Sequence, residues 1–311
     1  MKARAPGKLV LSGAYAVLEG APALVTAVDR FVEADTARPS ERTTPEVAAA
    51  LGSEPAPYFD ASALREGDRK LCLGSSAAIL VASLAAVELA RRERTAPGSA
   101  PLPDRELEDL VLAPALAAHA RAQGGGSGVD VAAAARGGTL LYTRGPEQPE
   151  LRSVALPPEL HVETWWSGEP AVTSTLVGTV RALAASEPLL HGRLLGAQTE
   201  ASSEAGRAVS QGDAGRFVAA LAAQRRALRA LGAAAGAKIV TDAAEALAAE
   251  AELERGTALP SGAGGGDVLI FVGLAPSSLR FRELAARLNH RWVPLSLGAR
   301  GVHAVGENTP S

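Results

Sequence analysis

The sequence predicts an α+β protein of two domains. A chain of 311 residues is longer than one hydrophobic core usually serves. Residues 2–34 contain short runs rich in leucine and valine, separated by glycine and proline, which are typical of strands joined by turns. Longer segments rich in alanine and leucine are typical of helices. The proline pair at 157–158 predicts a boundary between domains spanning residues 1–158 and 159–311.

Composition and charge exclude several classes of protein. With 47% hydrophobic and 21% charged residues, the chain is typical of a globular protein. Its net charge of -3 gives no overall attraction to nucleic acid or anionic lipid, so we expect no nucleic-acid partner. The single cysteine, Cys72, excludes an internal disulfide and a four-cysteine zinc site. We therefore expect a cytoplasmic protein.

Two apolar segments imitate export or membrane signals. Leu9–Leu18 resembles the core of a signal peptide, but Lys8 and Glu19 flank it, so we expect that it is not removed. Leu71–Val87 is shorter than the roughly 20 residues that cross a bilayer, and it contains Gly74. We expect a buried helix here and no membrane partner.

Residues 2–34 are expected to form a strand, a turn and a second strand, with apolar runs on either side of Gly20. Lys8 follows Gly7 at the start of the first strand, where it is either a solvated charge or a contact to a phosphate. Residues 37–68 contain several prolines and weak periodicity, so we expect loops and one edge hairpin.

Gly74, Ser75 and Ser76 directly precede the apolar segment Ile79–Ala90. A tight turn before a helix leaves backbone N–H groups at the positive end of the helix dipole, which is a site for an anion such as a phosphate. Glycine lets the backbone approach the phosphate closely, and either serine reaches a metal ion on the phosphates or caps the helix. A simple helix cap is the alternative.

Residues Asp104–Ala122 are expected to form a second helix, kinked at Pro114, which ends at three consecutive glycines, 124–126. Asp130 follows this loop and starts a short helix, Val131–Ala135. The aspartate is either an N-cap or a carboxylate held where a reacting hydroxyl could approach. Three glycines cost more backbone entropy than a cap requires, which favours a loop shaped around a ligand.

The second half alternates strands and helices. A strand is expected from Glu159 to the tryptophan pair 165–166. A third glycine-rich stretch, Leu259–Asp267, after those at Gly74 and at 124–126, precedes a strand at Val268–Val272. One interpretation of this stretch is a loop whose backbone approaches a ligand closely and whose Ser261 donates to an anion. The alternative interpretation is a mobile hairpin loop. The remaining helices are expected at Thr173–Leu183, Gly192–Gln211, Asp213–Leu231, Thr241–Leu253 and Ser278–Leu288, followed by a strand near Val293–Leu297 and a polar tail after Gly306.

Two common kinase patterns are absent from the sequence. No segment matches the P-loop, and the catalytic-loop and Asp-Phe-Gly signatures of protein kinases are missing. The five histidines have no metal-binding spacing.

Together the glycine-rich loops, a lysine near the start and an aspartate after the second loop resemble the GHMP small-molecule kinase superfamily. The three matching motifs are Ala5–Gly20, Leu71–Ala78 and Pro260–Asp267, and the resemblance covers nearly the whole chain. It implies a ribosomal-protein-S5-like α/β domain followed by a ferredoxin-like α+β domain.

Within the superfamily the chain is most similar to the phosphomevalonate kinase family. Segments that resemble this family are Gly13–Gly20, His119 with Gln123 and Gly124, Gly126–Ala133, Trp166–Ala171 and Lys238–Thr241. His119 stands eleven positions before Asp130, where mevalonate kinases carry a metal-binding glutamate. Ala14, Leu259 and Val268 depart from the family's usual glutamate, lysine and cysteine.

The resemblance implies transfer of a phosphoryl group from ATP, with Mg²⁺, to the phosphate of mevalonate 5-phosphate. It makes Lys8 and Asp130 the catalytic residues and Ser76 the metal ligand. The residues implied to bind ATP are Leu73, Gly74, Ser75, Ser76 and Ala77. Those implied to bind the acceptor are Lys8, Tyr15, His119, Gln123, Ser127, Gly128, Asp130, Ser174, Ser261, Gly262, Ala263 and Gly264.

Two further interpretations stay open. One is mevalonate kinase or another superfamily kinase with a hydroxyl acceptor. The other is a non-catalytic nucleotide-binding protein, suggested by Ala14 and Leu259. In each case the expected partners are ATP and a small molecule, and the expected state is a monomer or a homodimer.

Overall fold

The computed structural model describes residues 1–40, 43–169 and 173–306. The chain divides into two compact units, one formed by residues 1–9, 26–140 and 296–311 and the other by residues 10–25 and 141–295. The predicted likeness at Trp166–Ala171 extends into residues outside the described part, as does the predicted polar tail. The boundary between 158 and 159 stays a prediction.

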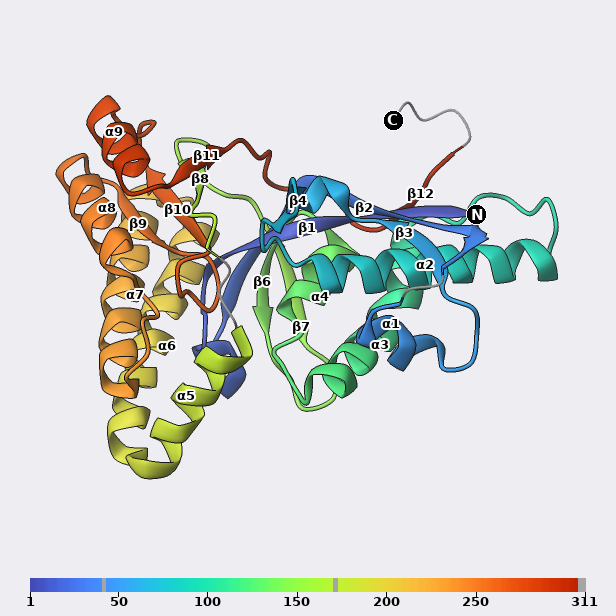
Figure 1. Cartoon of the computed structure of the whole chain (residues 1–311), viewed down its shortest axis with the longest axis horizontal. Helices are drawn as coiled ribbons and strands as arrows, with labels where there is room; N and C mark the ends of the chain where they lie inside the picture. The colour runs from blue at the N-terminus through green and yellow to red at the C-terminus, as the bar shows by residue number, and fades with distance from the viewer. Residues whose placement is uncertain (41–42, 170–172, 307–311) are drawn as a thin grey trace. The chain divides into compact units, whose positions relative to one another are not determined.

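The first unit combines one sheet with four helices. Within this unit the strands follow the order β12-β1-β2-β6, and β3 pairs antiparallel with β2. In Figure 1, α1 to α4 lie together on one face of the strands β1 to β3. The elements are β1 (Lys2–Ser12), β2 (Ala23–Pro39), α1 (Pro45–Leu51), β3 (Pro57–Asp60), β4 (Arg65–Glu66), β5 (Arg69–Lys70), α2 (Ser75–Thr95), α3 (Asp104–Gln123), α4 (Val129–Arg136), β6 (Thr139–Thr143) and β12 (His303–Ala304), with a 3-10 turn at Ser62–Leu64.

Alanine and leucine side chains let α2 pack deep in this unit. Its residues Ala77–Ser83 are all buried, as expected for the apolar segment after Gly74. Among the described residues, no helix combines the length and the apolar character needed to span a membrane. The expected strand, turn and strand at the start of the chain are confirmed as β1, a 3-10 turn at Ala16–Glu19 and β2.

The second unit holds a four-stranded antiparallel sheet of order β11-β8-β10-β9. Helices α6, α7 and α8 run side by side in Figure 1, and α7 and α8 contact β9. The elements are β7 (Glu150–Val154), β8 (His161–Trp166), α5 (Thr173–Ser186), α6 (Pro188–Gln211), α7 (Ala214–Ala235), α8 (Asp242–Leu253), β9 (Thr257–Pro260), β10 (Val268–Gly273), α9 (Leu279–Arg287) and β11 (Arg291–Val293).

Two apolar clusters lie in the core of the described part of this unit. One surrounds Phe281, whose ring packs edge to face against Trp165 and Phe271 with centroids 5.5 and 5.0 Å away. The other surrounds Tyr15 and includes Leu195 of α6 and Leu228 of α7. Aromatic residues are few, so alanines fill much of the remaining helix contact.

The structure differs from the sequence predictions in short elements. Helix α1 lies in the stretch expected to hold only loops and a hairpin, where Thr44 accepts a hydrogen bond from Val47 N as its N-cap. A short hairpin of β4 and β5 forms a separate two-stranded sheet, and β5 lies just after the stretch 37–68. Helix α3 continues through Pro114, and the last predicted strand lies earlier, at Arg291–Val293. A strand as short as β11 is stabilised by pairing with β8, a signal that local sequence does not carry.

Candidate active site

Lys8 and the turn before α2 lie together in the first unit. Gly7 has no side chain, and a Cβ there would come within 2.9 Å of Leu73 O, so β1 can approach this turn closely. Lys8 N donates to Leu73 O at 2.9 Å. A Cβ on Gly74 would lie 3.0 Å from Lys8 Cε, so the lysine stem occupies the space that glycine leaves. The backbone thus fixes the lysine against the predicted phosphate-binding turn.

Gly74 begins α2 in the left-handed conformation, with φ 77° and no side-chain cap. The first helical bond runs from Ala78 N to Gly74 O at 3.1 Å, so the N–H groups of Ser75, Ser76 and Ala77 come before the helical ladder. Neither serine caps the helix, so the alternative of a serine cap is wrong. The arrangement is a helix N-terminus with free donors beside a lysine, which suits a phosphate.

Asp130 faces Lys8. Its Oδ1 lies 3.5 Å from Lys8 Nζ, and the two side chains are 33% and 9% exposed. Gly128, with φ 79°, is the N-cap of α4, and Asp130 lies within the first turn. The alternative that Asp130 is a simple N-cap is therefore wrong. A nearly buried ammonium beside a half-exposed carboxylate provides opposite charges, one of which remains open to a ligand.

His119 and Gln123 end α3 near the triple glycine, and both interact with Glu46, a residue that was not predicted from the sequence. Gln123 Nε2 donates to Glu46 Oε1 at 3.0 Å, and both Glu46 and His119 are buried. Burial opposes ionisation of Glu46, but hydrogen bonds from Gln123, its own backbone and Thr44, with the charge of His119, lower its pKa overall. Glu46 lies in a stretch expected to be loop, and no local sequence pattern predicts its interactions with Gln123 and His119.

The remaining predicted residues of this unit lie in the loop between α3 and α4. A Cβ on Gly126 would lie 3.9 Å from His119 Nδ1, so the loop passes over the imidazole. Ser127 Oγ accepts from Val129 N at 3.4 Å, next to Gly128. The loop therefore links His119 to the start of the helix that carries Asp130.

The other predicted acceptor residues lie in the second unit. Tyr15 donates its hydroxyl to Ala263 O at 2.6 Å, and burial raises the pKa of this phenol. Ser261 Oγ accepts from Val10 N and donates to Val10 O, each at 3.0 Å. The first and third glycine-rich motifs are thereby joined within this unit.

Gly264 lies in a confined part of its loop, whereas Ser174 is exposed to solvent. Gly264 has φ 79°, and a Cβ there would lie 2.1 Å from Ile239 O, so only glycine fits. Gly265 N donates to Ile239 O at 2.9 Å, which fixes the loop. Ser174 is exposed in the first turn of α5. Gly262 faces open space.

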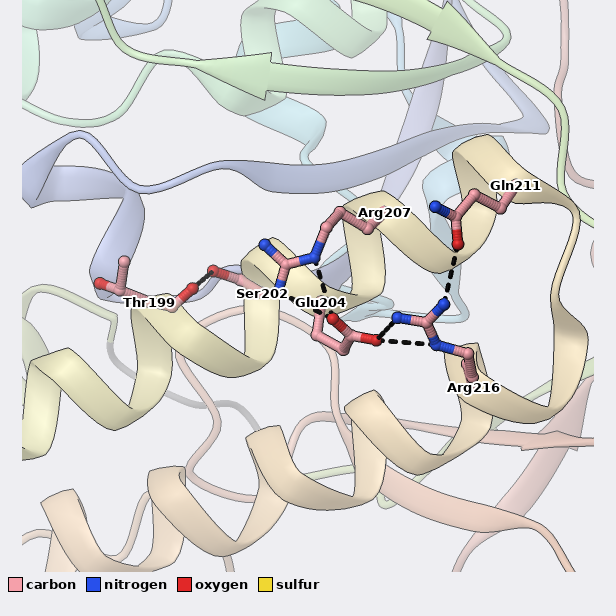
Figure 2. Close-up of polar contacts among 6 residues, drawn as sticks. All are labelled: Thr199, Ser202, Glu204, Arg207, Gln211 and Arg216. Carbon is pink, nitrogen blue, oxygen red and sulfur yellow. Dashed lines mark hydrogen bonds and ion pairs between the residues drawn. The ribbon is translucent and has the colours of Figure 1, made fainter.

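A separate hollow of about 530 Å³ lies between α6 and α7, lined mostly by alanines together with charged residues that include Glu204 and Arg216. Figure 2 shows Glu204 accepting from Arg207 and Arg216, with distances of 2.9 and 3.0 Å to their Nε atoms. None of the predicted site residues lines this hollow. The salt bridge between Glu204 and Arg216 joins the two helices on their exposed side.

The comparisons with known proteins place this geometry in context. No protein-family model matches the chain. A phosphomevalonate kinase of Streptomyces sp. (strain CL190) is 27% identical over 344 aligned positions, covering 85% of this chain and 87% of that protein.

Solved structures match over almost the whole chain. A Lin0012 protein from Listeria innocua has a TM-score of 0.82 at 22% identity, covering 97% of this chain and 99% of the other. Streptococcus pneumoniae phosphomevalonate kinase, in complex with phosphomevalonate and AMPPNP, has a TM-score of 0.73 at 19% identity, with coverage of 96% and 99%. Mevalonate kinase and galactokinase structures also match.

The chain therefore has the GHMP kinase fold, and the α+β class and the family resemblance expected from the sequence are confirmed. A curated relative to which it is similar is a phosphomevalonate kinase.

Proposed function

We propose that the chain is an ATP-dependent kinase that phosphorylates mevalonate 5-phosphate to the 5-diphosphate, in the mevalonate route to isoprenoids. The observation that carries this proposal is the Lys8–Asp130 pair, 3.5 Å apart, beside the N-terminus of α2. The similarity to phosphomevalonate kinases supports the choice of acceptor.

The helix N-terminus would hold the phosphates of ATP. The backbone from Leu73 to Ala77 supplies N–H donors and the positive end of the dipole of a 21-residue helix. Gly74 lets a phosphate approach without a Cβ in the way. The backbone N–H groups and the helix dipole stabilise the negative charge of the phosphates, and a side-chain substitution does not remove them.

Lys8 and Asp130 would act on the transferring group. An oxygen of the acceptor phosphate attacks the γ-phosphorus, and the bond to the β–γ bridging oxygen breaks, which releases ADP with the electron pair. Lys8 Nζ stabilises the charge on the transferred group. The acceptor phosphate is already largely ionised near neutral pH, so Asp130 orients lysine and acceptor and need not remove a proton.

The donor set fits a magnesium ion held mostly by phosphates. Among the described residues, no group of three or more histidine, cysteine, aspartate or glutamate side chains is placed to hold a metal. Magnesium usually keeps several waters and few protein ligands when phosphates bind it. Ser76, two residues after Gly74 and not engaged in capping, would be that ligand. The ion neutralises phosphate charge when bound.

The proposed contacts of the acceptor come from four segments of the chain. We propose contacts from the end of α3 and its loop, from the Tyr15 turn, from the first turn of α5 and from the loop after β9. These residues are His119, Gln123, Ser127, Gly128, Tyr15, Ser174, Ser261, Gly262, Ala263 and Gly264. We further propose a cytoplasmic monomer or homodimer that works without a nucleic-acid or membrane partner.

An assay of ADP release across a small set of acceptors tests the function. We expect turnover with mevalonate 5-phosphate, and much less with mevalonate or with no acceptor. Turnover with mevalonate alone would replace the proposal with a mevalonate kinase. Binding of ATP by calorimetry without ADP release from any acceptor would indicate a non-catalytic protein.

A further inference from the structure

The turn at Tyr15 is strained. Tyr15 has φ 63° and ψ -55°, and Ala16 N donates to Ala14 O at 2.8 Å. These angles and this bond define the rare form of the γ-turn, and a positive φ at a non-glycine residue costs roughly 1–3 kcal/mol. Gly13 before it has φ 89°, and a Cβ there would lie 2.5 Å from Ala23 Cα. Surrounding contacts must therefore hold the turn in place.

One such contact is on the side chain. The Tyr15 hydroxyl donates to Ala263 O in the third glycine-rich motif, and the ring packs with Leu195, Leu228 and Val180. This contact ties the position of the turn to that of the loop proposed to bind the acceptor.

The other contact is on the backbone. Gln224 of α7 is 1% exposed, and its Oε1 accepts from Ser12 Oγ at 2.7 Å and from Gly13 N at 3.2 Å. Its Nε2 donates to Oε1 of Gln198 of α6 at 2.9 Å, and Gln198 is fully buried. Because a backbone N–H can only donate, Gly13 fixes which end of the Gln224 amide faces the turn.

The two glutamines are attached to a braced helix pair. Asp213 caps α7 by accepting from Arg216 N at 2.9 Å, and Arg216 also bonds to Glu204 of α6 on the exposed side, as Figure 2 shows. The backbone of the turn is thus held by side chains of two long helices, in addition to the bond from Tyr15 to the loop at Ala263. Gln224 also lies three residues after Leu221 and four before Leu228, on the apolar face of α7. A polar side chain buried on such a face is normally there to form hydrogen bonds.

We propose that Gln224, oriented by Gln198, is a positioning residue for the acceptor: it holds the strained Ser12–Tyr15 turn, and through Tyr15 it fixes the loop at Ser261–Ala263. No proton or group passes through it. This inference rests on the proposed function, because that function makes Tyr15 and the loop at Ser261–Ala263 contacts of mevalonate 5-phosphate.

The test compares kinetics of Gln224→Leu with those of the wild type. Leucine has a similar volume and fills the site but accepts no hydrogen bond from Ser12 or Gly13. We expect KM for mevalonate 5-phosphate to rise at least about tenfold and KM for ATP to change by less than about twofold. The reason is that the lost hydrogen bonds, from Ser12 and Gly13 to Gln224, support the proposed acceptor contacts only. Equal changes in both KM values, or no change in either, would overturn the proposal.

Two control variants separate positioning from general stability. Gln224→Glu keeps oxygen acceptors for Ser12 and Gly13, and Gln198 Nε2, which has no partner among the described residues, can turn to donate to it. We expect its KM for the acceptor to stay within about twofold of the wild type. Phe217→Leu alters a fully buried residue of α7 outside the cluster around Tyr15, and should lower Tm without raising that KM.

A second measurement does not depend on activity. Hydrogen exchange of the peptide covering residues 10–20 should speed up in Gln224→Leu and remain as in the wild type in Phe217→Leu. If the wild type does not phosphorylate mevalonate 5-phosphate, the proposed function fails, while the exchange result still decides whether Gln224 holds the turn. Unchanged exchange in Gln224→Leu would refute the positioning role.

Discussion

Lys8 is fixed at both ends, by its backbone bond to Leu73 O and by Asp130 3.5 Å from Nζ. We predict that Lys8→Met folds normally and that its kcat falls about 10²- to 10³-fold, because methionine keeps the stem but loses the charge that stabilises the transition state. Steady-state ADP release with mevalonate 5-phosphate measures this loss. Asp130→Asn should also lose mainly kcat.

Lys2→Met is the matched control for this prediction. Lys2 lies on the same strand, and its exposed ammonium pairs with Glu33 at 3.0 Å. Exposed ion pairs contribute little, so its turnover should equal that of the wild type. Wild-type turnover in Lys8→Met would remove the lysine from the catalytic set.

Glu46 gives a prediction about pH. Its folded pKa lies below the unfolded value of 4.5, because hydrogen bonds and the charge of His119 outweigh burial. The ionised group therefore adds stability that is present above pH 4.5 and is lost as pH falls through the folded pKa. In urea unfolding, Glu46→Gln should be less stable than the wild type at pH 7, and the difference should shrink in acid.

An exposed glutamate serves as the reference for that measurement. Glu159→Gln changes one carboxylate outside any buried cluster, so its stability should follow the wild type across the pH range. A constant difference between Glu46→Gln and the wild type from pH 7 into acid would contradict the account.

At the scale of an element, the loop after β9 depends on a glycine. A Cβ on Gly264 would meet Ile239 O at 2.1 Å in addition to the cost of φ 79°, while Gly262 has φ 85° and open space. We predict that Gly264→Ala lowers the free energy of unfolding by several kcal/mol and Gly262→Ala by only about 1 kcal/mol. Equal losses in urea unfolding would show that the contact with Ile239 does not confine the loop.

The long helices could be predicted from the sequence, and several short elements could not. Helices α6, α7 and α8 follow regular apolar spacing, and Thr241 caps α8 by accepting from Ala244 N at 3.2 Å. Strand β7 and helix α1 have few residues and depend on tertiary partners. Local pattern carries no information on such partners.

For the whole molecule, the sequence predicted the fold class, and the family resemblance named Lys8 and Asp130 as catalytic residues. The structure brings these two residues together. The sequence did not predict Glu46 or the Gln198–Gln224 pair, because each acts through a residue distant in sequence. A polar residue on an apolar helix face was the only available signal, and it applies to Gln224 alone.

The last prediction concerns the stability of the whole chain with nucleotide. A ligand that binds only the folded state stabilises it by about 2.7 kcal/mol at a hundred times its Kd, so ATP with Mg²⁺ should raise Tm. Adding EDTA to the wild type removes the part of the Tm rise that depends on Mg²⁺. In Ser76→Ala this Mg²⁺-dependent part should be missing, because the proposed metal ligand is gone. Ser75→Ala, one residue away in the same turn, is the control and should keep it. An EDTA-sensitive rise of wild-type size in Ser76→Ala would exclude Ser76 as the ligand, and no rise in the wild type would contradict nucleotide binding at α2.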